Sequence, residues 1–342
     1  MAISRMKLSM FLRNKSLRDR YIAAVKRMKT GGSYQVFVNW HADSAVGNIA
    51  HDNVSFLHWH RAYIRIFEIE LQKADIALQT AVNPAFDSRN AISLPWWDYT
   101  TLNGADPRSS SGRTWRDNFM GPSGAGLNRH VPSGPFAGSV QWSIALPPPA
   151  NVLVRNLARA GLSLPTRAEI NRSLKLRVFD NNDMKYDGMP NPSDVNSFRA
   201  FLEGFVRVPP GPKSQMHNGG HTWVTGHMGS VPSAPNDPIF WLHHAAIDRL
   251  WARWQTRHPK LSDQYPSNAA VASALANNVN ALRADQPMRP WTSAAQAWTN
   301  GAGTTLFTTD IVRPSDVHNW TTMGASLGSY RIGGVNSRKL RF

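Results

Sequence analysis

Cysteine is absent from all 342 residues of this chain. Without thiols the protein cannot form a disulfide, use a thiolate nucleophile, or bind an iron–sulfur cluster or a cysteine-ligated zinc ion. Glutamate is also scarce, because only Glu68, Glu70, Glu169 and Glu203 occur. None of them begins a Glu-x-x-His sequence, which argues against a carboxylate-bridged di-iron bundle. A metal site must therefore rely on the 12 histidines and on the few carboxylates.

Long apolar runs are missing as well. No stretch of roughly 18 or more apolar residues occurs, so the sequence predicts no transmembrane helix and no membrane partner. The first residues lack an apolar segment followed by a small-residue cleavage site, so we expect no secretory signal. We therefore expect the protein in the cytoplasm, or exported together with a helper protein.

Positive charge is abundant, with a net charge of +16, but it is dispersed along the chain. There is no sustained basic run, zinc finger or RNP-type motif. We interpret the charge as a basic surface and expect no nucleic-acid partner, although a nucleic-acid-binding protein remains an alternative suggested by charge alone. If the charge surrounds an active site, it should attract anionic substrates.

Helical spacing of apolar residues dominates the chain, of which 42% is apolar and 18% charged. In the segment 53–79, apolar residues recur at steps of three, four and seven, the pattern of one helix face. The sequence Asn236-Asp237-Pro238 signals another helix start, because Asn or Asp caps helices and proline fits their first turn. We therefore expect helices over about residues 17–28, 53–79, 194–206 and 236–258, the third of them capped by Ser193.

Residues 95–192, in contrast, are rich in Pro, Gly, Ser and Asn. We expect long loops there around one weaker helix, over about residues 152–160. Strand signals are few and short, and no linker separates two independently patterned halves. The sequence thus predicts a mainly α fold with a single domain over residues 1–342 and no C-terminal lid domain.

A first group of histidines surrounds the start of the helix expected over residues 53–79. His51 and His60 are nine residues apart, and His41 lies ten residues before His51. His51 precedes the helix, while His60 lies inside it. A loop between His41 and His51 is free to bring the third imidazole to the same helix end.

A second group of histidines follows later in the chain. His217 and His221 are four residues apart, so on a helix they share one face and can bind one metal ion. His244 lies in the last expected helix and completes a second set of three. Imidazole ligands without thiolates or carboxylates suit copper or zinc, and spacing alone does not decide between them.

At these residues the sequence resembles the tyrosinases and related polyphenol oxidases, the type-3 dicopper proteins. The resemblance spans about residues 12–330, and its two copper motifs together are highly specific. The first motif is matched by His51, Phe56, Leu57, Trp59, His60 and Arg61, and the second by Asp237, Pro238, Phe240, His244 and Asp248. A third match is the paired-histidine helix of the family, at His217, Asn218, His221, Trp223 and Val224.

The resemblance implies a four-helix bundle that holds two copper ions between its helices. It also implies that Phe240 packs on an imidazole and that Asp248 supports a ligand from one helical turn away. The implied ligands are His41, His51 and His60 for the first copper, and His217, His221 and His244 for the second.

Two further residues are implied to be catalytic. In the family, residues at the places of Glu203 and Asn218 hold a water between them that takes the proton of a phenol. His58 and His243 lie beside implied ligands but face elsewhere on their helices. We interpret His58 as a residue that supports a ligand from behind or lies on the surface, and His243 as a packing residue. Gly219-Gly220 is poor helix material between the paired histidines, and we expect it to open space above the second copper.

The implied function is that of a dicopper oxidase. It would use O2 to hydroxylate monophenols at the ortho position and to oxidise o-diphenols to o-quinones. Its partners would be a phenolic substrate, O2 and a helper protein for copper loading. Catechol oxidase and o-aminophenol oxidase remain alternatives, and an O2 carrier of the haemocyanin kind is an alternative from another class.

Overall fold

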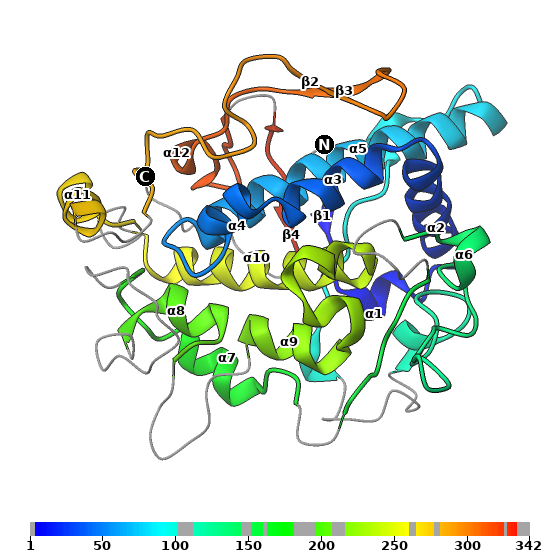
Figure 1. Cartoon of the computed structure of the whole chain (residues 1–342), viewed down its shortest axis with the longest axis horizontal. Coiled ribbons are helices and arrows are strands. Elements are labelled where there is room, and N and C mark those ends of the chain that lie inside the picture. The colour runs from blue at the N-terminus through cyan, green and yellow to red at the C-terminus, as the bar shows by residue number, and fades with distance from the viewer. Residues whose placement is uncertain are drawn as a thin grey trace.

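The computed structural model describes residues 4–101, 112–144, 152–159, 163–180, 196–206, 216–259, 265–276, 281–324 and 327–333. Helices make up most of the regular structure, as the sequence predicts (Figure 1). Strands in the described part form only two small sheets. In the first, β1 (Ser4–Arg5) pairs in parallel with β4 (Arg331–Ile332), and in the second, β2 (Gln296–Thr299) pairs antiparallel with β3 (Thr305–Thr309).

The two longest helices, α5 (Phe56–Val82) and α10 (Ile239–Arg257), pack against each other through the middle of the molecule (Figure 1). Both confirm the predicted positions. The Oδ1 atom of Asp237 accepts a hydrogen bond of 3.1 Å from the Ile239 amide, as expected for a residue just before a helix. The rings of Phe67 and Trp241 stack between the helices with centroids 3.5 Å apart, which fixes the distance between them.

Two further long helices complete the N-terminal half. Helix α2 (Lys15–Thr30) packs on α5 and begins where the Asn14 side chain accepts a hydrogen bond from the Leu17 amide. It ends before Gly32, whose φ of +90° favours glycine, and the chain then turns into α3 (Ser33–Ala42). The helix predicted over residues 17–28 is therefore confirmed and slightly longer.

The predicted helix over residues 194–206 is shorter in the structure. Helix α8 (Phe198–Glu203) begins at Ser197, whose hydroxyl accepts from the Ala200 amide, so Ser197 is the cap rather than Ser193. Residues 193–195 lie outside the described residues. Helix α9 (Met216–Val224) packs against α8 and α10 and contains Gly219 and Gly220.

The weaker helix predicted over residues 152–160 is wrong for the described residues 152–159. The backbone there is irregular, with a turn at residues 157–158. Leu153 O accepts from the Val131 amide at 2.9 Å, and the Arg155 amide donates to Arg129 O at 3.1 Å. The buried guanidinium of Arg155 also binds both carboxylate oxygens of Asp237 at 2.6 Å. These distant partners outweigh the local helical tendency. A helix does occur nearby, at α7 (Arg167–Ser173), where Thr166 and Glu169 form a capping box.

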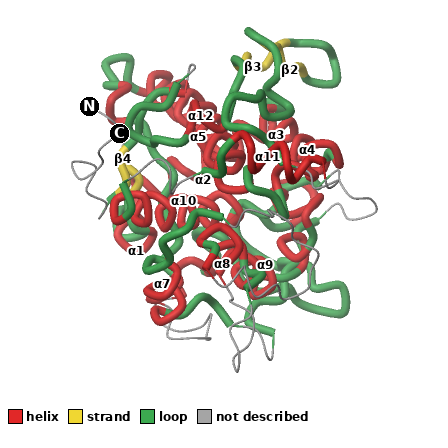
Figure 2. The backbone as a smooth tube through the Cα atoms, turned by 90° about the vertical axis from the view of Figure 1, so that its left-hand side faces the viewer, coloured by secondary structure: helices red, strands yellow, loops and turns green. Residues whose placement is uncertain are grey.

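Short elements and loops connect the long helices, and loops form a large part of the chain (Figure 2). These elements are the helices α1 (Leu8–Phe11), α4 (Ser44–Ala50), α6 (Gly138–Gln141), α11 (Asn268–Ala276) and α12 (Pro314–Val317), and the 3-10 turns η1 (Ser88–Asn90), η2 (Tyr99–Thr101), η3 (Gly112–Trp115), η5 (Gly226–Gly229) and η6 (Val231–Asn236). None of the described helices is both long and apolar enough for a membrane span.

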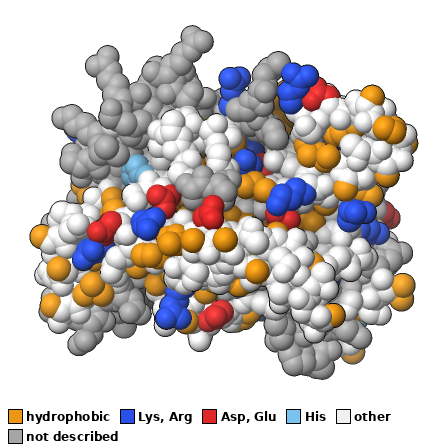
Figure 3. Space-filling model, turned by 90° about the horizontal axis from the view of Figure 1, so that it is seen from above, with side chains coloured by type: hydrophobic (Ala, Val, Ile, Leu, Met, Phe, Trp, Pro, Cys, Tyr) orange, Lys and Arg blue, Asp and Glu red, His pale blue; other side chains and the backbone are white. Residues whose placement is uncertain are grey.

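A buried network of charged residues joins the chain ends to α5 and α10. Asp248 accepts hydrogen bonds from Arg61 at 2.5 Å and from Arg5 at 2.8 Å, and it also accepts from the Tyr330 hydroxyl. Glu68 binds Arg5 at 2.8 Å on the other side. On the surface, the face seen from above mixes basic with acidic side chains (Figure 3).

Candidate metal centre

The structure brings the first three histidines together at one end of α5. His41 lies in α3, His51 directly follows α4, and His60 lies in the second turn of α5. Each ring has one nitrogen that lies within 4.8 Å of a nitrogen of both other rings. This spacing fits three ligands around a single metal ion.

For His41 and His60, hydrogen bonds fix which ring nitrogen is free. Carbonyl oxygens only accept, so the His41 Nδ1 donates to Val231 O at 2.7 Å and the His60 Nδ1 donates to Phe56 O at 2.9 Å. Their Nε2 atoms are buried and have no hydrogen-bond partner within the described part of the chain. Orphaned lone pairs of this kind are what a bound metal would satisfy.

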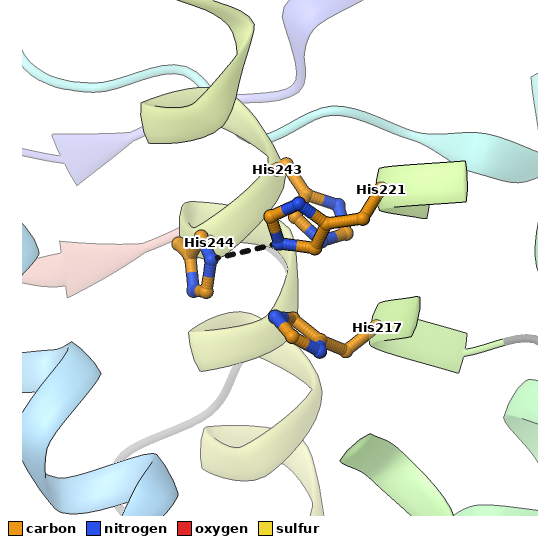
Figure 4. A group of neighbouring side chains, drawn as sticks. All are labelled: His217, His221, His243 and His244. Atoms are coloured by element: carbon orange, nitrogen blue, oxygen red, sulfur yellow. Dashed lines mark hydrogen bonds between the residues drawn. The ribbon is translucent and has the colours of Figure 1, made fainter. Parts of the chain in front are cut away.

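The second group is built the same way from α9 and α10. Figure 4 shows His217 and His221 reaching from α9 toward His243 and His244 of α10. His221 donates from Nδ1 to Met228 O at 2.7 Å, which leaves its Nε2 only 3.3 Å from the His244 Nε2. His217 Nδ1 contacts the Asn218 Oδ1 at 3.0 Å, and its Nε2 is another buried orphan.

The two groups face each other between the helices. The rings of His60 and His244 are stacked, with centroids 4.3 Å apart and planes 9° from parallel. His217 lies 6.2 Å from His60, measured between ring centroids. Two metal ions held by these groups would therefore be neighbours, able to bind one small molecule together.

Burial keeps the imidazoles neutral, which is the form that binds metals. It lowers the pKa of His51 to about 3 and that of His221 to about 4. The pKa values of the other four expected ligands also lie well below the usual range, mainly because of burial and then because of neighbouring imidazoles. Protons therefore compete little with a metal near neutral pH.

A fourth imidazole, His243, belongs to the second group, so the interpretation that it faces elsewhere is wrong: a ring nitrogen of His243 lies within 4.8 Å of nitrogens of the other three histidines. Its ring centroid is 4.7 Å from that of His221, and its Nδ1 contacts the Tyr99 hydroxyl at 2.7 Å. Gly220 makes this possible, since a Cβ at that position would lie 2.2 Å from the His243 Cε1. The open space expected at Gly220 is thus filled by the His243 ring. In the sequence, the glycine at position 220 was the one sign that another side chain packs there.

Replacing Gly220 by alanine should therefore displace the His243 ring. Overpacking of this kind costs about 1–3 kcal/mol, and the helix carrying His217 and His221 would shift. We expect a lower melting temperature and loss of metal from the second group, measured by thermal unfolding and metal analysis.

Gly47 is the matched control, because a Cβ there would meet no atom within 4 Å. Gly47→Ala lies within α4 and should be neutral or slightly stabilising. Equal melting temperatures for the two variants would contradict the crowded position of His243.

The remaining sequence predictions around the histidines have mixed outcomes. Phe240 packs on His244 with ring centroids 4.2 Å apart, as expected. Asp248 contacts Arg5, Arg61 and Tyr330 rather than an imidazole, so it supports the site only by joining α5 to α10. His58 is buried and contacts His318 at 3.0 Å, away from the metal groups, which excludes a surface position.

A cavity of about 320 Å³ opens onto both histidine groups. Among its lining residues are ligand candidates from each group together with Asp52, Glu203, Phe205 and Asn218. Glu203 and Asn218 come close because Gly204, with a φ of +106°, lies against Asn218: a Cβ on Gly204 would be 2.9 Å from the Asn218 Cβ. The two residues expected to act together thus share one cavity beside the second group.

Glu203 is a buried acid with two hydrogen-bond partners. Its Oε2 accepts from Arg199 at 2.8 Å, and its Oε1 accepts from the Asp52 amide at 2.8 Å. Burial raises the pKa of Glu203 to about 8, opposed by the positive charge of Arg199. Such a carboxylate changes its protonation state near neutral pH, as a general base requires.

Comparisons with known proteins agree with this geometry. Residues 31–257 match the family described as the common central domain of tyrosinase. Tyrosinase of Streptomyces antibioticus is 34% identical over 286 residues, covering 81% of this chain and 89% of that protein. Grixazone synthase of Streptomyces griseus is 33% identical over 275 residues, covering 72% and 83%. A mutant polyphenol oxidase of Thermothelomyces thermophila shares the fold, with a TM-score of 0.58 at 19% identity over 96% of this chain and 88% of that one.

Proposed function

The chain belongs to the tyrosinase family and is a copper-dependent oxidoreductase, and from that premise we propose that it hydroxylates monophenols and oxidises o-diphenols to o-quinones. The observation that carries this proposal is the pair of facing histidine groups, one of three and one of four imidazoles, that open onto one cavity with Glu203 and Asn218. Two copper ions held by His41, His51, His60, His217, His221 and His244 would supply the chemistry of O2.

The residues of this chain would bind the phenol and take its proton. A free phenol has a pKa of about 10, so near neutral pH it needs a base before it can react as phenolate. Glu203 lines the cavity beside Asn218 and can accept that proton, directly or through a water. Positioned proton transfer of this kind typically contributes about 10²–10⁴-fold to a rate.

We expect Glu203→Gln to lower the turnover of a monophenol by about 10²–10⁴-fold and that of an o-diphenol much less. Because the base form of Glu203 grows as pH rises through about 8, wild-type monophenol turnover should increase between pH 7 and 9. This rise should be absent in Glu203→Gln. Initial rates of tyramine and 4-methylcatechol oxidation across pH would measure both effects, and equal losses for the two substrates would exclude Glu203 as the base.

Oxygen uptake by copper-loaded protein tests the proposed function itself. We expect uptake with tyrosine or tyramine, with L-DOPA and with an o-aminophenol. Uptake with L-DOPA but never with a monophenol would make catechol oxidase or o-aminophenol oxidase the better name. Reversible O2 binding without turnover of any phenol would instead indicate an O2 carrier.

Two expectations on the cellular setting stay predictions. We propose that a helper protein loads copper, since the ligand nitrogens of both groups are largely buried. Location in the cytoplasm, or export with that helper, is likewise a proposal. Fractionation of cells that produce the protein, with copper analysis of each fraction, would test both.

A further inference from the structure

The charge lining the active-site cavity is opposite to the charge of the whole protein. The two acidic lining residues of the cavity are Asp52 and Glu203, and no lysine or arginine lines it within the described ranges. Because Glu203 has a pKa of about 8 and is mostly protonated at pH 7, Asp52 carries the negative charge there. The nearby guanidinium of Arg199 is buried and binds both Asp180 and Glu203, each at 2.8 Å. Two carboxyl groups therefore bind this guanidinium, and the positive charge that dominates the composition is not found on the cavity wall among the described residues.

Asp52 is the carboxylate that stays available to a ligand. It directly follows His51, and its side chain is exposed at the cavity. Its amide donates to Glu203, but its carboxylate forms no hydrogen bond or ion pair among the residues that the structure describes. The backbone at Asp52 has a φ of +51°, a left-handed conformation that Asp and Asn tolerate better than most residues.

We propose that Asp52 is a specificity-determining residue that selects phenols with a cationic amine on the side chain. This inference rests on the proposed phenol oxidation, whose substrate class it narrows. A phenol bound with its hydroxyl at the histidine groups extends its side chain toward the cavity wall, where Asp52 would attract an ammonium and repel a carboxylate. The expectation that the basic surface favours anionic phenols is thereby reversed.

Three o-diphenols of different charge test the inference, because they do not depend on monophenol hydroxylation. Dopamine is cationic, 4-methylcatechol is neutral, and 3,4-dihydroxyphenylpropionate is anionic. At low salt and pH 7 we expect kcat/KM for dopamine to exceed that for the anionic diphenol by about tenfold or more. Rising salt should reduce this ratio, because the contact is partly exposed.

Asp52→Asn should remove the preference while keeping the backbone turn, because Asn also tolerates the left-handed region. We expect the ratio of dopamine to anionic diphenol to fall by about fivefold or more, and Asp52→Glu to restore part of it. Asp285→Asn is the matched control, since it removes one exposed carboxylate that pairs with Arg283 and does not line the cavity.

The possible failures are distinguishable. If copper-loaded wild type oxidises all three diphenols with similar kcat/KM, or if Asp52→Asn keeps the wild-type ratio, Asp52 does not select the substrate while the oxidase assignment stands. If no diphenol is oxidised, the proposed function is wrong and this inference falls with it. A shift of equal size in Asp285→Asn would assign the effect to overall charge and overturn the inference as well.

Discussion

Replacing His60 or His244 by alanine is expected to reduce copper content from two ions to one per chain and to abolish nearly all phenol oxidation. Each residue is one of the three expected ligands of its copper ion, and the two rings stack on each other across the site. With two ligands left, a copper ion keeps neither its geometry nor its affinity. Metal analysis and oxygen uptake on the purified variants would measure the two effects.

Neighbouring histidines provide the controls for this prediction. His58→Ala removes an imidazole from the same helix, but one that contacts His318 and Trp251 instead of the ligand groups. His243→Ala removes the imidazole whose Nδ1 binds Tyr99. His58→Ala is expected to keep two coppers. His243→Ala is expected to keep them as well, because His217, His221 and His244 are the assigned ligands; loss of one copper in this variant would make His243 a ligand. Full activity in His60→Ala or His244→Ala would refute the ligand assignment.

Asp248→Ala is expected to destabilise the protein by about 3–5 kcal/mol, the usual cost of removing one partner from a buried ion pair. Asp248 accepts hydrogen bonds from Arg5 and Arg61, whose side chains are fully buried, and from Tyr330. Without the Asp248 carboxylate, the buried guanidinium groups of Arg5 and Arg61 would each lose an ion-pair partner. Since a folded domain has only about 5–15 kcal/mol of net stability, equilibrium unfolding in urea should show a large shift.

An exposed ion pair serves as the control for this second prediction. Asp285 binds Arg283 at 2.9 Å, with side chains that are 59% and 43% exposed. Solvent-exposed pairs contribute only about 0–1 kcal/mol, so Asp285→Ala should unfold at nearly the wild-type urea concentration. If Asp248→Ala also unfolded there, the buried network would not hold α5 and α10 together in the way the contacts indicate.

The sign of the charge at the cavity could not be predicted from composition. A net charge of +16 suggests that anionic ligands are attracted, yet Asp52 and Glu203 line the cavity. Composition sums charges over the whole chain, whereas a substrate responds to the few groups near it. The fold decides which charged groups lie near the substrate, because it brings Glu203 at the end of α8 and Asp52, which follows His51, to the same cavity.

The sequence by itself determined the features that depend on near neighbours along the chain. The helices α5 and α10 follow from spacings of three, four and seven residues, because helical contacts repeat every few residues. The six expected ligand histidines follow from the short motifs that the sequence shares with the tyrosinase family. The tertiary structure alone decided the features that join distant segments. It set the free nitrogen of His41 through Val231, placed His243 over Gly220, and kept residues 152–159 from forming a helix by burying Arg155 against Asp237. Contacts between residues far apart in sequence leave no periodic trace, so they become visible only when the chain has folded.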